Sequence, residues 1–305
     1  MSSLAAAYHA VRARGGVIDL SRRVKLALTG ADRVRYLQGQ VTSNVQKLAP
    51  SATQPACVTT AKGRLCAEVM ITAAAEALLI DAEESLRETL PPRLERYIIA
   101  DDVAVTELDP EKRLLHFLDT KPDWLGDSPV HAATRFGRPG WDWWPDAATV
   151  EKLWPEITQR VEVIGEALAE VLRIEAGVPR WGRELDETTL PPEAGLDRTH
   201  IDYHKGCYVG QEVISRLKSV GHVNRQLVGF LSPSGVPLAT GWEIVAADGD
   251  ARLLGVLTSA AHSFALEKPI ALGYLKRGSP TGALLARPAG AMGVVVTVCE
   301  LPFHS

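Results

Sequence analysis

One short segment concentrates the residue types that could do chemistry. Residues 200–212 read His-Ile-Asp-Tyr-His-Lys-Gly-Cys-Tyr-Val-Gly-Gln-Glu. Glycine on both sides of Cys207, at Gly206 and Gly210, allows the thiol to lie on a tight, partly exposed turn. Between positions 198 and 225, five Lys and Arg residues stand against two acidic ones, and nearby cations such as Lys205 lower the pKa of a thiol. Cys207 is therefore the candidate reactive thiol; the alternative is a small, buried, apolar side chain.

The same segment offers a weaker pattern for a metal ion. His200, His204 and Cys207 stand at i, i+4 and i+7, a spacing that on a helix would direct two imidazoles and a thiolate to one side. Gly206 argues against a continuous helix, so solvated or packed histidines are the alternative, and no metal site is assigned. Cys57, Cys66 and Cys299 lie in apolar strand patterns, which indicates a packing role.

A second candidate is the carboxylate of Glu175, in the run Arg-Ile-Glu-Ala-Gly over residues 173–177. A carboxylate there could accept paired hydrogen bonds from a planar heterocycle such as a pterin. The alternative is a glutamate ion-paired at the end of a helix. A helix over 165–176 with Gly177 as its stop is the clearest helical pattern of the second half.

The elements that must position these residues divide into three groups. Residues 22–29 alternate like a strand and lead into a helix, whereas 57–60 and 65–72 read as a hairpin closed by a glycine turn. From 224 onward, short strands separated by Gly and Pro indicate a small β-barrel. We predict an α+β protein with a discontinuous central domain (1–50 and 119–223), an inserted domain with an antiparallel sheet (51–118) and a C-terminal β-barrel (224–305).

Composition excludes several classes of protein. The 305 residues are 46% hydrophobic and 23% charged, with a net charge of −4, as in an ordinary soluble globular protein and without the positive field that bulk nucleic-acid binding needs. No apolar run approaches the ~18 residues of a membrane span. Four cysteines without a C-x-x-C pair favour a reducing compartment, so a cytoplasmic location with no membrane or direct nucleic-acid partner is expected.

At these motifs the chain resembles a known family. Residues 205–212, Lys-Gly-Cys-Tyr-Val-Gly-Gln-Glu, followed by Arg216, are similar to the signature of the YgfZ-type folate-binding proteins, relatives of the glycine cleavage T-protein (aminomethyltransferase). The segments 28–45, 173–185 and 255–274 resemble the N-terminal, central and C-terminal parts of that family.

The resemblance implies three domains in a clover-leaf around a central hole that holds tetrahydrofolate. It also implies a role in maintaining iron–sulfur enzymes, including enzymes that modify tRNA, with iron–sulfur client or assembly proteins as partners and a transient iron–sulfur cluster. Carried onto this chain, Glu175 anchors the pterin and Cys207, beside Lys205, is the reactive or cluster-associated thiol. Tyr208, Gln211 and Arg216 of the signature join the folate site.

One departure from the transferase pattern decides between two functions. Aminomethyltransferases carry a Gly-Gly-x-x-Asp-Asp type segment on the hairpin strand, whose carboxylate serves the transfer chemistry. The matching Asp positions here hold Cys66 and Ala67, and Glu68, one residue further, points to the other face of a strand. We therefore expect a non-transferase folate-binding protein that supports iron–sulfur cluster assembly or repair; the alternative is a folate-dependent aminomethyltransferase whose carboxylate comes from another residue.

Overall fold

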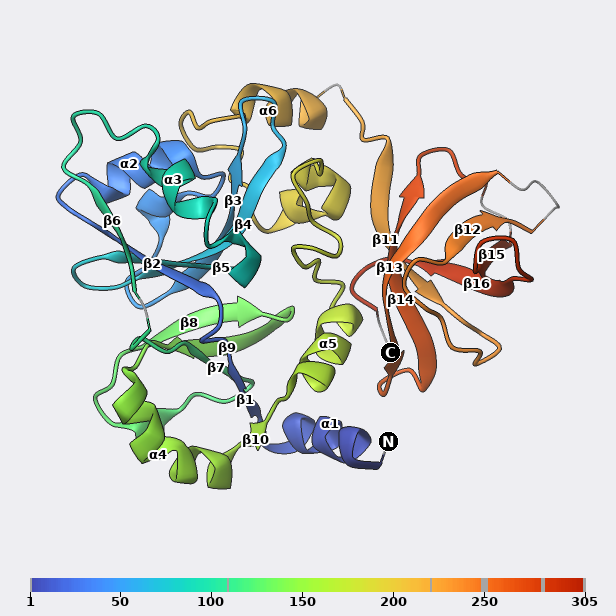
Figure 1. The fold of residues 1–305 in the computed structure, drawn as a ribbon, viewed down its shortest axis with the longest axis horizontal. Coiled ribbons are helices and arrows are strands. Elements are labelled where there is room, and N and C mark those ends of the chain that lie inside the picture. The colour runs from blue at the N-terminus through green and yellow to red at the C-terminus, as the bar shows by residue number, and fades with distance from the viewer. Residues whose placement is uncertain (1, 109, 220, 248–251, 281–282, 304–305) are drawn as a thin grey trace.

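Three groups of elements make up the molecule. The computed structural model describes residues 2–108, 110–219, 221–247, 252–280 and 283–303. Two mixed layers of sheet and helix lie next to each other, and a barrel lies to one side, with helix α5 and the irregular segment 177–210 between them (Figure 1). This arrangement confirms the predicted α+β class with a C-terminal β-barrel.

The first sheet is antiparallel and has the order β3-β4-β5-β2-β6. Its strands are β2 (Val24–Thr29), β3 (Thr53–Thr59), β4 (Leu65–Ala73), β5 (Leu78–Ala82) and β6 (Ala104–Glu107). The helices of this layer are α2 (Arg33–Gln40) and α3 (Leu90–Glu95), with single turns η1 (Val45–Lys47) and η2 (Glu84–Leu86). Apolar side chains of the sheet and of both helices form one buried core on the helix side of the sheet.

The second sheet has the order β10-β1-β7-β9-β8. Its strands are β1 (Gly16–Asp19), β7 (Leu115–Leu118), β8 (Val130–Arg135), β9 (Arg138–Trp143) and β10 (Glu162–Val163). Helix α4 (Ala147–Arg160) and the turn η3 (Asp123–Leu125) supply Ile157, Trp154 and Trp124 to its core. The two sheets meet at their edge strands, where Ala132 of β8 bridges Ala52 just before β3.

The sheets divide the chain differently from the predicted boundaries. Strand β2 was expected in the central domain with residues 119–223, yet it pairs with β5 and β6 in the first sheet. Strand β7 was placed in the inserted part, yet it pairs with β1 and β9 in the second sheet. Pairing across the sheet, which the local pattern of a strand does not encode, accounts for both differences.

The C-terminal strands close into a six-stranded barrel in the order β11-β14-β13-β12-β15-β16. They are β11 (Arg225–Leu231), β12 (Glu243–Ala246), β13 (Leu253–Ser263), β14 (Lys268–Lys276), β15 (Leu284–Arg287) and β16 (Val294–Cys299). The small β-barrel predicted from the short strands after residue 224 is thus confirmed.

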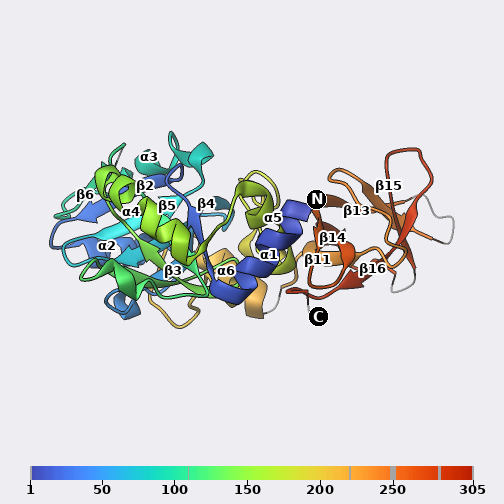
Figure 2. The ribbon, with the colours of Figure 1, turned by 90° about the horizontal axis from the view of Figure 1, so that it is seen from below.

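Helices and turns between the layers hold them together. They are α1 (Ser2–Arg14), α5 (Glu166–Glu175), η4 (Pro191–Ala194), η5 (Leu196–Arg198) and α6 (Gln211–Ser219). Helix α1 lies beside α5, close to the barrel (Figures 1 and 2). Helix α5 ends at Glu175, two residues before Gly177, which has a φ of 66°. A Cβ atom at Gly177 would come within 2.7 Å of the Leu301 side chain. None of the described helices is long and apolar enough to cross a membrane.

Candidate active site

The segment 198–210 carries most of the predicted site residues and is fixed to the first layer by its main chain. The amide of Asp202 donates to the carbonyl of Thr42, and the amide of Val209 donates to that of Gly39. In return, the Thr42 hydroxyl donates to the carbonyl of His200 at 2.6 Å. These bonds hold the irregular segment in one conformation beside β3. Its glycines allow the tight turns that this conformation requires.

Lys205 anchors this segment. Its Nζ donates to the carbonyls of Gln38, Val41 and Ser43 at 2.6, 2.6 and 2.7 Å. The side chain is buried, and burial lowers the pKa of Lys205 to about 8, although the negative charge of Asp202 acts to raise it. The ammonium is thus directed at main-chain oxygens around the end of α2. This placement makes Lys205 a structural anchor. Its predicted role beside the thiol of Cys207 stays a prediction.

Lys205→Met should therefore destabilise the fold. The methionine keeps most of the apolar stem but leaves three buried carbonyls without this donor, at a cost of roughly 2–4 kcal/mol. Urea unfolding of the variant and of Lys62→Met, at an exposed turn lysine, measures the difference. Equal stabilities of the two variants would contradict the anchoring role.

Cys207 lies on an irregular stretch between Lys205 and α6 and is exposed and unpaired as a disulfide. Cys57 is fully buried on β3, and burial together with the charge of Glu68 raises the pKa of its thiol. Burial also raises the pKa of Cys299. Of these three thiols, Cys207 is the most exposed, since Cys57 is buried and Cys299 is half-buried.

The two histidines and Cys207 do not form a ligand set. The residues from 200 to 208 are not helical, so the spacing i, i+4, i+7 does not place them on one side. His204 is exposed, whereas His200 turns toward β4. Among the described residues, no group of three or more His, Cys, Asp or Glu side chains is placed to hold a metal ion.

The carboxylate of Glu68 is a candidate functional group that the sequence pattern did not favour. Strand β4 has a bulge at Cys66, since Val58 pairs with Ala67 and Thr59 with Leu65. Ala67 is fully buried in the core of the first layer. Glu68 lies opposite Cys57 on the other face, where its Oε1 is 3.4 Å from Nε2 of His200. A carboxylate is therefore present on this strand, one residue beyond the expected position.

Several charges decide the ionisation of Glu68. Burial alone raises the pKa of this carboxyl, but the hydrogen bond from His200 and the charges of His200, Arg23 and Arg135 outweigh burial, so its pKa is lowered. The side chain keeps 17% exposure. A partly accessible carboxylate that is ionised at neutral pH can accept a proton or stabilise a developing cation.

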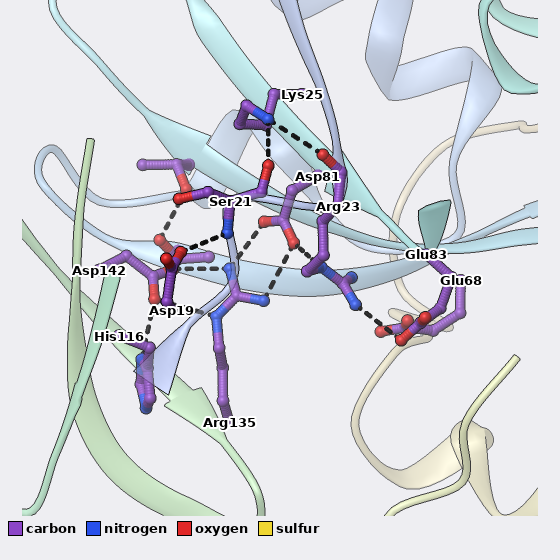
Figure 3. A network of polar contacts seen from close by, with 12 residues as sticks. Asp19, Ser21, Arg23, Lys25, Glu68, Asp81, Glu83, His116, Arg135 and Asp142 are labelled. Atoms are coloured by element: carbon purple, nitrogen blue, oxygen red, sulfur yellow. Dashed lines mark hydrogen bonds and ion pairs between the residues drawn. The ribbon is translucent and has the colours of Figure 1, made fainter. Parts of the chain in front are cut away.

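Behind Glu68, buried ion pairs join the two sheets (Figure 3). The Arg135 guanidinium on β8 donates to both oxygens of Asp81 on β5, at 3.0 and 2.6 Å, and to both oxygens of Asp142 on β9, at 2.9 and 2.8 Å. Arg23 also bonds Asp81 and reaches Glu83 at 3.0 Å. His116 completes the group through Nδ1, 2.8 Å from Asp142. These residues fix the positive charges that face Glu68.

Both oxygens of the Glu175 carboxylate already accept hydrogen bonds. The Tyr8 hydroxyl donates to Oε2 at 3.0 Å, and Ser263 and the amide of Ala265 donate to Oε1. Glu175 thus joins α5 to α1 and to the end of β13. The nearby guanidinium of Arg173 donates to Glu170, Glu184 and Ser259. Because Ser259 lies on β13, Arg173 and Glu175 together connect the end of α5 to the barrel.

The remaining residues carried over from the resemblance lie at three different places. Tyr208 is buried, and its hydroxyl has no hydrogen-bond partner among the described residues. Gln211 is the first residue of α6, and its main-chain N–H donates to the carbonyl of Tyr208. Arg216 is exposed on α6. Of these three residues, Tyr208 is the one with a buried hydroxyl that lacks a hydrogen-bond partner. A polar ligand could supply that partner.

An open cavity of about 210 Å³ adjoins the same segment. It is lined by Ser43, Asn44, Lys47, Gln54, Pro55, Thr199, Ile201 and Asp202. Thr199 and Ile201, the two chain neighbours of His200, are part of this lining, whereas His200 and Glu68 are not. Its lining is polar, which suits a small hydrogen-bonding group.

Together, the fold and this site define a three-part mixed α/β protein with a closed C-terminal barrel and a half-buried carboxylate on β4. Comparison with known proteins shows which families and relatives this chain is similar to. Residues 225–304 match the family model of the glycine cleavage T-protein C-terminal barrel domain. An aminomethyltransferase of Rubrobacter xylanophilus is 27% identical over 99% of this chain and 87% of its own length. One of Thermosynechococcus vestitus is 29% identical over 90% of this chain and 80% of its own.

A solved structure shares the whole fold. The crystal structure of glycine cleavage system aminomethyltransferase T from Bartonella henselae matches with a TM-score of 0.86 and 19% identity, over 99% of this chain and 89% of that one. The chain is thus similar to aminomethyltransferases in sequence and shares the fold of a glycine cleavage T-protein. These similarities do not single out the YgfZ-type branch.

The comparisons contradict the expected iron–sulfur function. Relatives that match nearly the whole chain are aminomethyltransferases, which favours the transferase alternative and gives no support to iron–sulfur partners, an iron–sulfur cluster or a link to tRNA modification. The expectation was wrong because it relied on the absence of a carboxylate at Cys66 and Ala67. The bulge and the alternation of β4 place Glu68 on the open face instead.

Proposed function

We propose that this protein is a folate-dependent aminomethyltransferase. The aminomethyl group arrives on a carrier thiol. Its methylene passes to the two nitrogens of tetrahydrofolate, ammonia leaves, and the carrier thiol is released. The two N–H protons that the folate gives up balance the protons taken by ammonia and by the thiol. A carboxylate beside the reacting nitrogen assists because it can accept one of these protons in transit.

The observation that carries this proposal is the ionised Glu68 carboxylate on the open face of β4. It stands one residue beyond the family's Asp positions, and Arg23, Arg135 and His200 keep it ionised. The relatives' activity and the shared fold support the same assignment. Cys207 is not required in this reaction, since no thiol of the protein enters the balance.

For the folate itself, Tyr208 is the residue that fits best. Its buried hydroxyl lacks a partner, whereas the Glu175 oxygens are engaged by Tyr8, Ser263 and Ala265. The pterin-anchoring role of Glu175 that the resemblance implies would require exchange of those bonds. We therefore assign the hydrogen bond to folate first to Tyr208.

The test combines folate binding with turnover. Tetrahydrofolate should raise the thermal midpoint of the protein, and a carrier protein loaded with an aminomethyl group should release ammonia only when folate is present. Tyr208→Phe should weaken folate binding by roughly two- to tenfold without loss of stability, because the hydroxyl gives up no partner within the protein. Absence of both folate stabilisation and turnover would overturn the proposal. An unchanged folate affinity in Tyr208→Phe would show that Tyr208 does not make the hydrogen bond to folate.

A further inference from the structure

Both the main chain and the imidazole ring of His200 make hydrogen bonds with other residues. Its amide donates to the carbonyl of Leu196 at 2.8 Å, and its carbonyl accepts from the Thr42 hydroxyl. The ring is 2.7 Å from the Thr199 hydroxyl at Nδ1 and 3.4 Å from Glu68 at Nε2. Main chain and ring are thus both fixed, and the fixed ring ends on the carboxylate of the proposed function.

The contact with Glu68 indicates which ring nitrogen of His200 carries a hydrogen. A carboxylate only accepts, so the nitrogen that faces Glu68 must donate, and Nε2 carries the hydrogen. The Thr199 hydroxyl can donate to Nδ1, which leaves the neutral ring as the Nε2–H tautomer. In the opposite tautomer the lone pair of Nε2 would face the carboxylate, which is repulsive.

We propose that His200, fixed by Thr199, is a positioning residue that holds the Glu68 carboxylate in one orientation on the open face of β4. Among the described residues, the hydrogen bond from His200 is the one that the Glu68 side chain makes. The other charged and titratable groups that face Glu68 act through space: Arg23 before β2, Arg135 on β8 and Cys57 on β3. His200 therefore supplies the directional contact. The inference rests on the proposed function only for its kinetic consequence.

The first test reads the tautomer and needs no activity. Nitrogen-15 NMR of histidine-labelled full-length protein, assigned with His200→Gln, should show that Nε2 of His200 carries a hydrogen. Thr199→Val removes the hydroxyl at nearly constant shape and should leave the hydrogen on Nε2, because Glu68 still faces that nitrogen. A His200 that carries hydrogen on Nδ1 alone in the wild-type protein would overturn the proposal.

The second test reads the carboxylate. Carbon-13 NMR titration of labelled glutamate side chains, assigned with Glu68→Gln, should show a higher pKa for Glu68 in His200→Leu than in the wild-type protein. His200→Gln keeps an N–H donor near the position of Nε2 and should restore much of the wild-type titration. An unchanged titration of Glu68 in a folded His200→Leu would overturn the proposal.

Turnover separates this inference from the proposed function. His200→Leu should lower kcat by ~10–100-fold with little change in KM for folate, because positioning contacts of a reacting group have effects of this size, and His200→Gln should recover part of the loss. If Glu68→Gln keeps full turnover while the NMR results hold, the proposed function fails and the positioning contact stands. If Glu68→Gln loses turnover and His200→Leu does not, the positioning role fails alone.

Discussion

Glu68→Gln is expected to lower the turnover of an aminomethyl-loaded carrier by about 10²–10⁴-fold, the usual contribution of a general acid or base. Glutamine has the shape of glutamate and can still accept the hydrogen bond from His200, so the fold should persist. It cannot accept a proton or offer a negative charge to the reacting centre. The thermal midpoint and the affinity for tetrahydrofolate should therefore stay close to those of the wild-type protein.

The matched control is Glu76→Gln, the same change in the exposed turn between β4 and β5. It should leave turnover within twofold of the wild-type rate, since a single surface charge has little effect at a distance. Single-turnover kinetics with saturating folate separates chemistry from binding. A Glu68→Gln protein that transfers the methylene at the wild-type rate would remove Glu68 from the reaction.

The position of this carboxylate shows what the sequence pattern could and could not resolve. Alternation along the hairpin strand predicts that Ala67 and Glu68 face opposite sides, and the structure confirms this. The pattern does not say which side is the core. Ala67 is fully buried among Ala56, Val58 and Val69, so an aspartate at this position would lose its hydration inside an apolar layer. The open face belongs to Glu68.

Local signals were reliable where one element decides the outcome. The stop of α5 just before Gly177 and most strands of the barrel follow from glycine placement and short apolar runs, which are encoded within each segment. The turn character of the segment around Gly206 follows in the same way. The ammonium of Lys205, by contrast, meets carbonyls more than 160 positions away in the chain. No spacing within residues 198–225 predicts that contact.

The buried ion pairs between the sheets were likewise beyond sequence reasoning. Asp81, Arg135 and Asp142 come from three different strands of two sheets, and each alone resembles an ordinary surface charge. Only the edge-to-edge arrangement of β3 and β8 brings the two sheets close enough for one guanidinium to serve both carboxylates. These ion pairs also contribute to the lowered pKa of Glu68, after the hydrogen bond and charge of His200, because they fix Arg23 and Arg135 nearby.

Arg135→Met should cause the largest loss of stability, roughly 3–5 kcal/mol at pH 7, because it leaves Asp81 and Asp142 buried without their shared cation. Arg138→Met, directly opposite on β9, removes an ion pair with Asp119 that is partly exposed and should cost only about 0–1 kcal/mol. Urea unfolding of both variants measures the difference. Equal losses would show that the buried pairs contribute no more than a surface pair.

The same experiment at pH 3 tests the cause. Burial raises the pKa of Asp142, but the charge of Arg135 and the hydrogen bond and charge of His116 outweigh it and hold that pKa far below its ordinary value. A carboxyl with a lowered folded-state pKa stabilises the fold above its unfolded pKa of about 3.9 and loses that contribution as the pH falls. In Arg135→Met the buried carboxyl no longer has this advantage, so the gap in unfolding free energy from wild type should be smaller at pH 3 than at pH 7. A gap that stays constant with pH would mean that packing of the arginine stem, rather than its charge, joins the two sheets.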